Sequence, residues 1–171
     1  MVKVGIVGLG YSKPVERPNC DYVIGVNDAP AYCDRIVVVD PISVFSFERQ
    51  QAIINHKGMM WATQLEWSAH RPMFNFQLHS RRGVMDCILQ NEVPQSITSI
   101  IPAIGTAYLC FGKKAKYKLY GVDLLDHQSL SRKELIDIIA KDLKAIGKLI
   151  DLSFGAVHKD SPLVGVLPEF P

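Results

Sequence analysis

The chain has 171 residues, of which 48% are hydrophobic and 21% charged, and its formal net charge is +2. This length fits a single domain over residues 1–171, and the ordinary composition excludes a disordered or fibrous chain. The small net charge gives no reason to expect nucleic acid or an acidic membrane surface as a partner.

Apolar, β-branched runs alternate with turn residues over the first third of the chain, a pattern typical of buried parallel strands. Strands are predicted over residues 2–7, 21–26 and 34–40. Pro41 cannot continue a ladder, so the third strand is expected to end at Asp40. A helix is predicted over residues 43–56, and a short strand follows it over residues 59–63.

The second half predicts two longer helices. Residues 66–91 show weak periodicity and indicate only an edge strand over residues 74–80. A helix capped by Ser96 or Thr98 is predicted over residues 96–112, followed by a strand over residues 117–122. Ser131 and Glu134 have the spacing of a capping box and open a helix over residues 131–150. With a tail expected to wrap back over the sheet, this order predicts an α/β, three-layer Rossmann-like domain with a mostly parallel sheet.

The four cysteines and the N-terminal residues indicate a reducing compartment. No pair of cysteines has the C-x-x-C spacing of zinc or thioredoxin-type sites, and no metal site is predicted. Residues 1–10 open a strand and lack the parts of a signal peptide. No apolar run approaches the roughly 20 residues that span a bilayer. We expect a cytoplasmic protein with reduced, mostly buried thiols and no membrane partner.

The first strand ends in a glycine turn that matches a dinucleotide fingerprint only in part. Gly8 and Gly10 supply the first two glycines of G-x-G-x-x-G, but Lys13 stands at the third position. Ten residues separate Gly10 from Asp21, and two of them are prolines, so a helix of three turns does not fit. Because a dinucleotide fold seats its pyrophosphate on that helix, a nicotinamide or flavin cofactor is disfavoured.

The same turn still offers a phosphate site. Successive backbone amides at Gly8 and Gly10 can form a concave nest, to which Ser12 adds a hydroxyl group and Lys13 a charge. A plain tight turn is the alternative interpretation, and the motif alone does not separate the two.

Polar residues also follow the other predicted strands. Asn27 and Asp28 come after the second strand, Asp40 closes the third, and Asp123 and His127 follow a later one. Ligands of open parallel sheets bind outside the carboxyl ends of the strands, so one shared crevice is predicted. Asn27 and Asp28 suit a nucleoside, while Asp123 and His127 are candidates for acid–base chemistry. Each of these residues taken alone is common in a turn. The prediction of a site depends on their shared position at the strand ends. The other histidines have no ligand spacing and are interpreted as structural.

Several short motifs follow one another along nearly the whole chain: GLGYS, VIGVNDAP, RIVVVDP, GTAYLCFGKKAKYKLYGVDLLDH and DSPL. In this order they resemble the Rossmann-like group that contains bacterial sialyltransferases, pterin diphosphokinase-like proteins and many phage or prophage proteins of unknown function. In that group a G-x-G-P-S turn leads by a short loop to a strand ending in Asn. A helix of small residues then precedes a strand ending in G-[IV]-D.

The resemblance implies a nucleotide-phosphate turn and a strand-end Asn that contacts the nucleotide. Tyr11 replaces the usual proline of the turn. No position matches the catalytic histidine of the sialyltransferases, and the metal- and diphosphate-binding residues of the pterin enzymes are not recognisable. The positions that carry over are Gly8, Gly10, Ser12, Asn27, Asp40, Gly121, Asp123 and Ser161.

These observations predict a nucleotide- or nucleotide-sugar-binding transferase-like protein of unknown substrate and cofactor, consistent with a phage origin. If active, it would transfer a glycosyl or phosphoryl group by positioning and charge stabilisation. The alternative is a non-catalytic binding or assembly protein on the same fold, which the missing histidine and the short chain favour. A homo-oligomer is left open.

Overall fold

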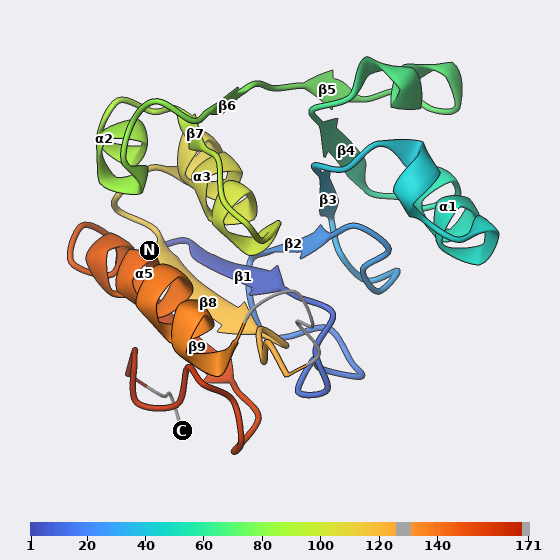
Figure 1. Ribbon diagram of the computed structural model, residues 1–171. Helices are drawn as coiled ribbons and strands as arrows, with labels where there is room; N and C mark the ends of the chain where they lie inside the picture. The colour runs from blue at the N-terminus through green and yellow to red at the C-terminus, as the bar shows by residue number, and fades with distance from the viewer. Residues whose placement is uncertain (126–130, 169–171) are drawn as a thin grey trace.

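The computed structural model describes residues 1–125 and 131–168 and is built on one seven-stranded sheet (Figure 1). Every strand pair in it is parallel. A second, two-stranded sheet pairs β6 (Leu78–His79) with β7 (Val93–Pro94). Across the large sheet the order is β5 (Phe74–Asn75), β4 (Met59–Ala62), β3 (Arg35–Val38), β2 (Tyr22–Val26), β1 (Lys3–Val7), β8 (Lys116–Tyr120) and β9 (Asp151–Ala156).

Helices cover the two faces of the sheet and give a three-layer α/β, Rossmann-like fold. On one face lie α2 (Val84–Leu89), α3 (Ile100–Phe111) and a continuous helical run. That run comprises α4 (Arg132–Leu135), a π-helical turn (Ile136–Ala140) and α5 (Lys141–Ile146). On the other face, α1 (Phe47–Ile54) packs beside β3 and β4, flanked by 3₁₀ turns at Ile42–Val44 and Leu65–Ala69.

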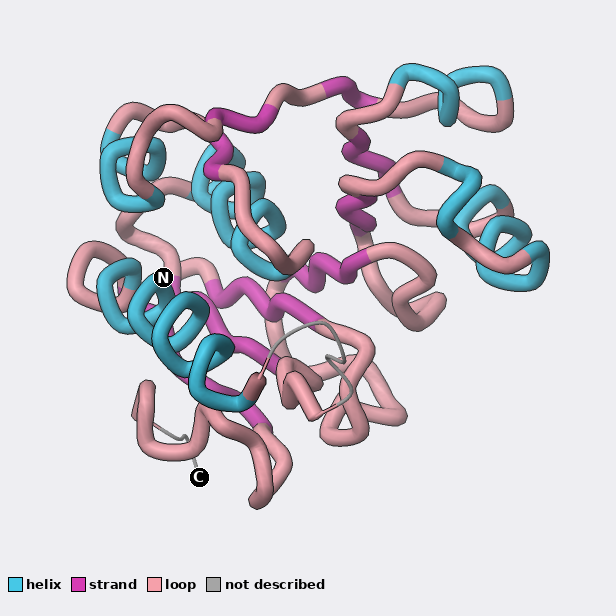
Figure 2. The backbone as a smooth tube through the Cα atoms, in the orientation of Figure 1, coloured by secondary structure: helices cyan, strands magenta, loops and turns pink. Residues whose placement is uncertain are grey.

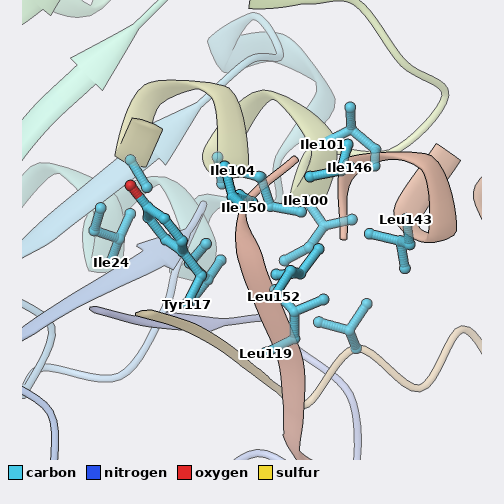
Figure 3. Close-up of a cluster of buried hydrophobic side chains, with 14 of the residues drawn as sticks. Ile24, Ile100, Ile101, Ile104, Tyr117, Leu119, Leu143, Ile146, Ile150 and Leu152 are labelled. Atoms are coloured by element: carbon cyan, nitrogen blue, oxygen red, sulfur yellow. The ribbon is translucent and has the colours of Figure 1, made fainter. Parts of the chain in front are cut away.

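Alternation along the buried strands separates two apolar cores. The larger core joins β1, β2, β8 and β9 to α3 and α5, and Figure 3 shows Ile104, Tyr117 and Leu152 within it. The smaller core takes the opposite faces of β2, β3 and β4 and closes them with Ile53 of α1. Such β-branched, fully buried strands are what a parallel sheet covered on both faces requires.

The link from β1 to β2 has no helix among residues 8–21, as its two prolines predict. Long-range contacts hold this loop instead. The Tyr32 hydroxyl donates to the carbonyl of Pro14 at 2.7 Å, and Arg17 forms an ion pair with Asp34 at 2.6 Å. The chain therefore crosses between the two strands without covering that face with a helix.

Most predicted elements are present, and several expectations were wrong or incomplete. The edge strand predicted over residues 74–80 is divided between β5 of the large sheet and β6 of the small one, and β3 ends at Val38 rather than at Asp40. Helix α3 begins after Ser99, which makes no side-chain capping bond, rather than at Ser96 or Thr98. Strand β9 was not predicted, because Ser153 and Gly155 weaken its β-propensity and only pairing with β8 orders it. Two of the four thiols, those of Cys20 and Cys110, are partly exposed.

Local chemistry did predict the start of α4. Ser131 and Glu134 form the expected capping box, in which each side chain accepts a hydrogen bond from the other residue's backbone N–H group.

Among the described residues, no helix has the length and apolar character needed to cross a bilayer.

Candidate functional site

The topology creates a crevice between β1 and β8. From β1 the chain builds β2 to β5 on one side, and it returns to add β8 and β9 on the other. At such a switch point the neighbouring connections leave room for a ligand outside the carboxyl ends of the strands. Figure 2 shows the loops that follow β1 and β8 gathered at this edge.

A cavity of about 670 Å³, here called the switch-point cavity, opens at this edge. It is lined by predicted residues from three strand ends, namely Gly8, Gly10, Asn27, Asp28 and Asp123. The predicted convergence at one rim is therefore found for these five positions, while their contact with a ligand stays a prediction.

Two predicted residues in the described part of the chain do not line the cavity. Ser12 is bound to Asp123 and is absent from the lining. Asp40 does not share the rim, because β3 lies two strands away from β1, and its backbone carbonyl accepts a hydrogen bond from the Trp67 indole at 3.1 Å. A further predicted residue, His127, falls outside the described residues.

The glycine turn packs against β8 and does not form the predicted nest. The Gly8 amide donates to the carbonyl of Tyr120 at 2.8 Å, and the Gly10 amide donates to that of Gly121 at 2.7 Å. The Ser12 amide donates to the Asp123 carboxylate at 2.6 Å. These amides are therefore not available to a phosphate group.

Close approach to β8 explains why this turn needs glycine. A Cβ atom at Gly8 would lie 2.6 Å from the Gly121 carbonyl oxygen. A Cβ atom at Gly10 would lie 2.6 Å from both that oxygen and Asp123 Oδ2. The two glycines thus serve chain packing at the crevice, and they reach the cavity through their backbone.

Asp123 connects three segments of the chain. It is 1% exposed, and its carboxylate accepts hydrogen bonds from the amide and hydroxyl groups of Ser12 and from the amide of His158 at 2.8 Å. Both carboxylate oxygens are therefore engaged by the protein. This geometry favours a positioning role over the acid–base role expected from the sequence.

Two buried polar atoms in the cavity-lining residues lack hydrogen-bond partners within the described part of the chain. They are Asn27 Oδ1 and Thr98 Oγ1. Asn27 adopts a left-handed backbone conformation, with φ 52°, while its amide continues the ladder to Val37. Since buried polar atoms are normally paired, these two atoms set Asn27 and Thr98 apart from the other lining residues.

Helix α3 points its first turn at the same cavity, which is lined by residues 97–100. The first N–H groups of a helix have no intrahelical partner, and here the side chain of Ser99 does not cap them. These groups and the helix dipole favour a negatively charged ligand. The feature that favours an anion therefore lies at the first turn of α3, 90 residues beyond the glycine turn where the sequence pattern predicted it.

Two cationic residues, Lys13 and Arg49, also line the cavity. Nε and Nη2 of Arg49 donate to Asp28 Oδ1 at 2.9 and 2.5 Å, and the guanidinium group stacks over Phe45 with 5.0 Å to the ring centroid. Asp28, predicted to bind a nucleoside, thus orients an arginine. Arg49 was missed because it belongs to α1, far along the sequence from the strand ends.

His158 lies beside the cavity, although the sequence indicated a structural role. Its ring centroid is 6.3 Å from that of Tyr11, which lines the cavity. Its Nδ1 accepts a hydrogen bond from the Asp160 amide at 3.2 Å, so the neutral ring carries its proton on Nε2. Its isolated position in the sequence carried no signal for this placement.

No family model, no curated protein and no solved structure matches this chain. The resemblance to the Rossmann-like group of transferases therefore stays a prediction.

Proposed function

We propose that the chain binds a nucleotide or nucleotide sugar in the switch-point cavity and acts on it as a transferase. The observation that carries the proposal is the pair of unpartnered buried atoms, Asn27 Oδ1 and Thr98 Oγ1, at a cavity that also receives a helix N-terminus. An acceptor, a hydroxyl group and an anion-favouring helix end are complementary to the base or sugar and the phosphates of such a ligand.

The size and charge of the cavity support this ligand class. Its volume of about 670 Å³ lies within the range of roughly 300–1,000 Å³ that is usual for small-molecule sites. Phosphates placed at the first turn of α3 would be near Lys13 and Arg49, whose charges favour the anion. The exposed apolar residues Tyr11, Ile97 and Leu125 line the same cavity and suit the flat face of a base.

For the transfer step we assign to His158 a hydrogen bond to the leaving group, without transfer of its proton. The Nε2–H group of the neutral ring can donate to a departing phosphate oxygen, while Asp123 holds the His158 backbone in place. The step is displacement at an activated sugar or phosphoryl group, with binding at α3 stabilising the leaving phosphate. His127, the other histidine proposed from the sequence, remains a candidate beyond the described residues.

A second candidate is a binding or assembly protein that holds the nucleotide without turnover. The engagement of both Asp123 oxygens by Ser12 and His158 favours it, because this buried carboxylate already serves to hold two segments of the chain together. The two candidates share the ligand and differ only in chemistry.

A thermal and calorimetric screen against nucleotides and nucleotide sugars tests binding. A bound nucleotide at 100 times its dissociation constant should add about 2.7 kcal/mol to the free energy of unfolding. Asn27→Gly, which tolerates positive φ, and Thr98→Val should each weaken binding about tenfold by removing one hydrogen bond.

Asn91→Gly is the matched control, since Asn91 also has positive φ, at 58°, but is exposed and does not line the cavity. Unchanged melting across all the nucleotides would overturn the proposal. Release of free nucleotide from a nucleotide sugar, lost in His158→Gln with binding retained, identifies the transferase; binding with no release identifies the binding protein.

A further inference from the structure

A second hollow lies on the sheet face turned away from α3 and α5. It has a volume of about 290 Å³ and is here called the lysine hollow. Its lining includes Lys3, Lys116, Lys118, Asn19, Tyr120 and Ser153. None of these residues lines the switch-point cavity, so the two spaces are separate.

The lysine hollow exists because this face lacks a helix. In β8, Tyr117 and Leu119 point into the core beneath α3 and α5, which directs the alternate residues to the opposite face. Parallel sheets normally have helices on both faces. Here the link from β1 to β2 is a loop, and α1 packs on β3 and β4, so among the described residues no helix covers β1, β8 and β9 on this side.

Short side chains beside Lys118 shape the space. In the strand register, Lys118 lies between Gly5 of β1 and Ser153 of β9. Neither neighbour is long enough to cover it. The Tyr120 ring lies across Gly155, where a Cβ atom would be 2.1 Å from a ring carbon, and so bounds the hollow toward the carboxyl ends of the strands.

The charge of the lining is positive. Lys3 and Lys116 are register partners at the amino ends of β1 and β8, and Lys118 lies two residues further along. Asp151 lies beside the hollow and pairs with Lys116 at 3.6 Å, while the Asp21 carboxylate accepts from the Lys3 backbone at 2.8 Å. Within the described chain, no carboxylate belongs to the lining itself.

We propose that the lysine hollow binds a phosphate group, either as inorganic phosphate or as a phosphate monoester. Three ammonium groups supply charge, and the side chains of Asn19 and Tyr120 supply neutral polar groups around the same space. The volume admits one phosphate with a small organic substituent and is too small for a nucleoside polyphosphate with all its phosphates enclosed. This site is independent of the nucleotide proposal, because it lies on the other face of the sheet.

Titration of the ¹⁵N-labelled full chain with inorganic phosphate and with glycerol phosphate, at constant ionic strength, tests the site by amide NMR. Saturable shifts are expected at the amides of Lys3, Lys118 and Ser153. Lys118→Gln should weaken the affinity at least tenfold and Lys3→Gln at least threefold. Lys114→Gln, which removes an equal charge from an exposed position before β8, should change the affinity less than twofold.

The two ligands distinguish the source of the phosphate group. Tighter binding of glycerol phosphate assigns the hollow to a monoester, and equal or weaker binding assigns it to inorganic phosphate. Shifts that do not saturate, or an equal loss of affinity in Lys114→Gln, would overturn the proposal by indicating general charge screening. Shifts confined to Asn27 and Thr98 would also overturn it by placing the phosphate in the switch-point cavity.

Discussion

At the scale of single residues, Asp123 shows how one buried carboxylate organises the candidate site. Its partners, Ser12 and His158, are 111 and 35 residues away in the sequence. Hydrogen bonds to a charged acceptor contribute about 1.5–3 kcal/mol each. Asp123 therefore joins the loop after β1 to the segment after β9, and the positions of Tyr11 and His158 depend on it.

Replacing this carboxylate tests its positioning role. In Asp123→Asn, one oxygen becomes an NH₂ group that faces donors, so we expect a loss of about 2–4 kcal/mol in the free energy of unfolding. Urea denaturation measures it. Asp160→Asn, at an exposed position, should change the stability by less than about 0.5 kcal/mol. Equal stability of the two variants would contradict the role assigned to Asp123.

A second residue-scale prediction concerns the buried imidazole of His56. Burial lowers the pKa of His56 below its usual value. The hydrogen bond with the Pro30 carbonyl raises this pKa, and the nearby charge of Arg71 lowers it. Nδ1 accepts from the Gly58 amide at 2.9 Å, a bond that protonation removes. The unfolded state therefore binds protons more readily than the folded state. The contribution of His56 to the free energy of unfolding should be fully present above the unfolded pKa of about 6.5 and should fall as the pH drops below it.

Urea midpoints measured between pH 8 and pH 5 show this dependence. His56→Gln should lose part of the decrease toward pH 5, whereas His70→Gln, at an exposed position, should keep it. A wild-type curve and a His56→Gln curve of the same shape would exclude His56 as the titrating group.

At the scale of elements, the contact between α3 and β7 decides how the small sheet joins the domain. Gly105 lies inside α3, where a Cβ atom would be 2.7 Å from Cδ of Pro94 and 3.4 Å from Cα of Val93. The helix therefore approaches the strand more closely than any side chain permits.

Gly105→Ala tests this contact against helix propensity. Alanine in a helix interior is about 1 kcal/mol better than glycine, but the overlap with Pro94 should cost about 1–3 kcal/mol and exceed that gain. We expect a lower free energy of unfolding in urea. Lys141→Ala, at an exposed helical position, controls for propensity alone. A stabilised Gly105→Ala variant would show that the helix can move away from β7 without cost.

The elements also show which structural features neighbouring residues in the sequence predict. The capping box at Ser131 and the absence of a helix after Gly10 were both predicted, because each depends on residues a few positions apart. Strand β9 was not, since two of its residues, Ser153 and Gly155, have weak β-propensity. Its order comes from pairing with β8, which lies more than 30 residues earlier.

At the scale of the whole molecule, strand order positions two separate cavities. Placing β8 next to β1 brings the segments after β1, β2 and β8 to one edge and aims α3 at them. The same neighbours, with no helix between β1 and β2, leave the lysine-bearing face uncovered. The position of β8 next to β1 therefore underlies both the nucleotide proposal and the phosphate proposal.

By itself, the sequence determined the α/β class, most strands and helices, and the convergence of Gly8, Gly10, Asn27, Asp28 and Asp123, because strand ends and turns follow from local residue chemistry. Only the tertiary structure decided which groups at that edge are already bonded. In the folded chain the glycine-turn amides donate to backbone carbonyl groups, and Asp28 pairs with Arg49. Among the described residues, Asn27 Oδ1 and Thr98 Oγ1 have no partners. The reason is physical: a hydrogen-bond partner is set by distance in space, and strand order fixes that distance between residues remote in the chain.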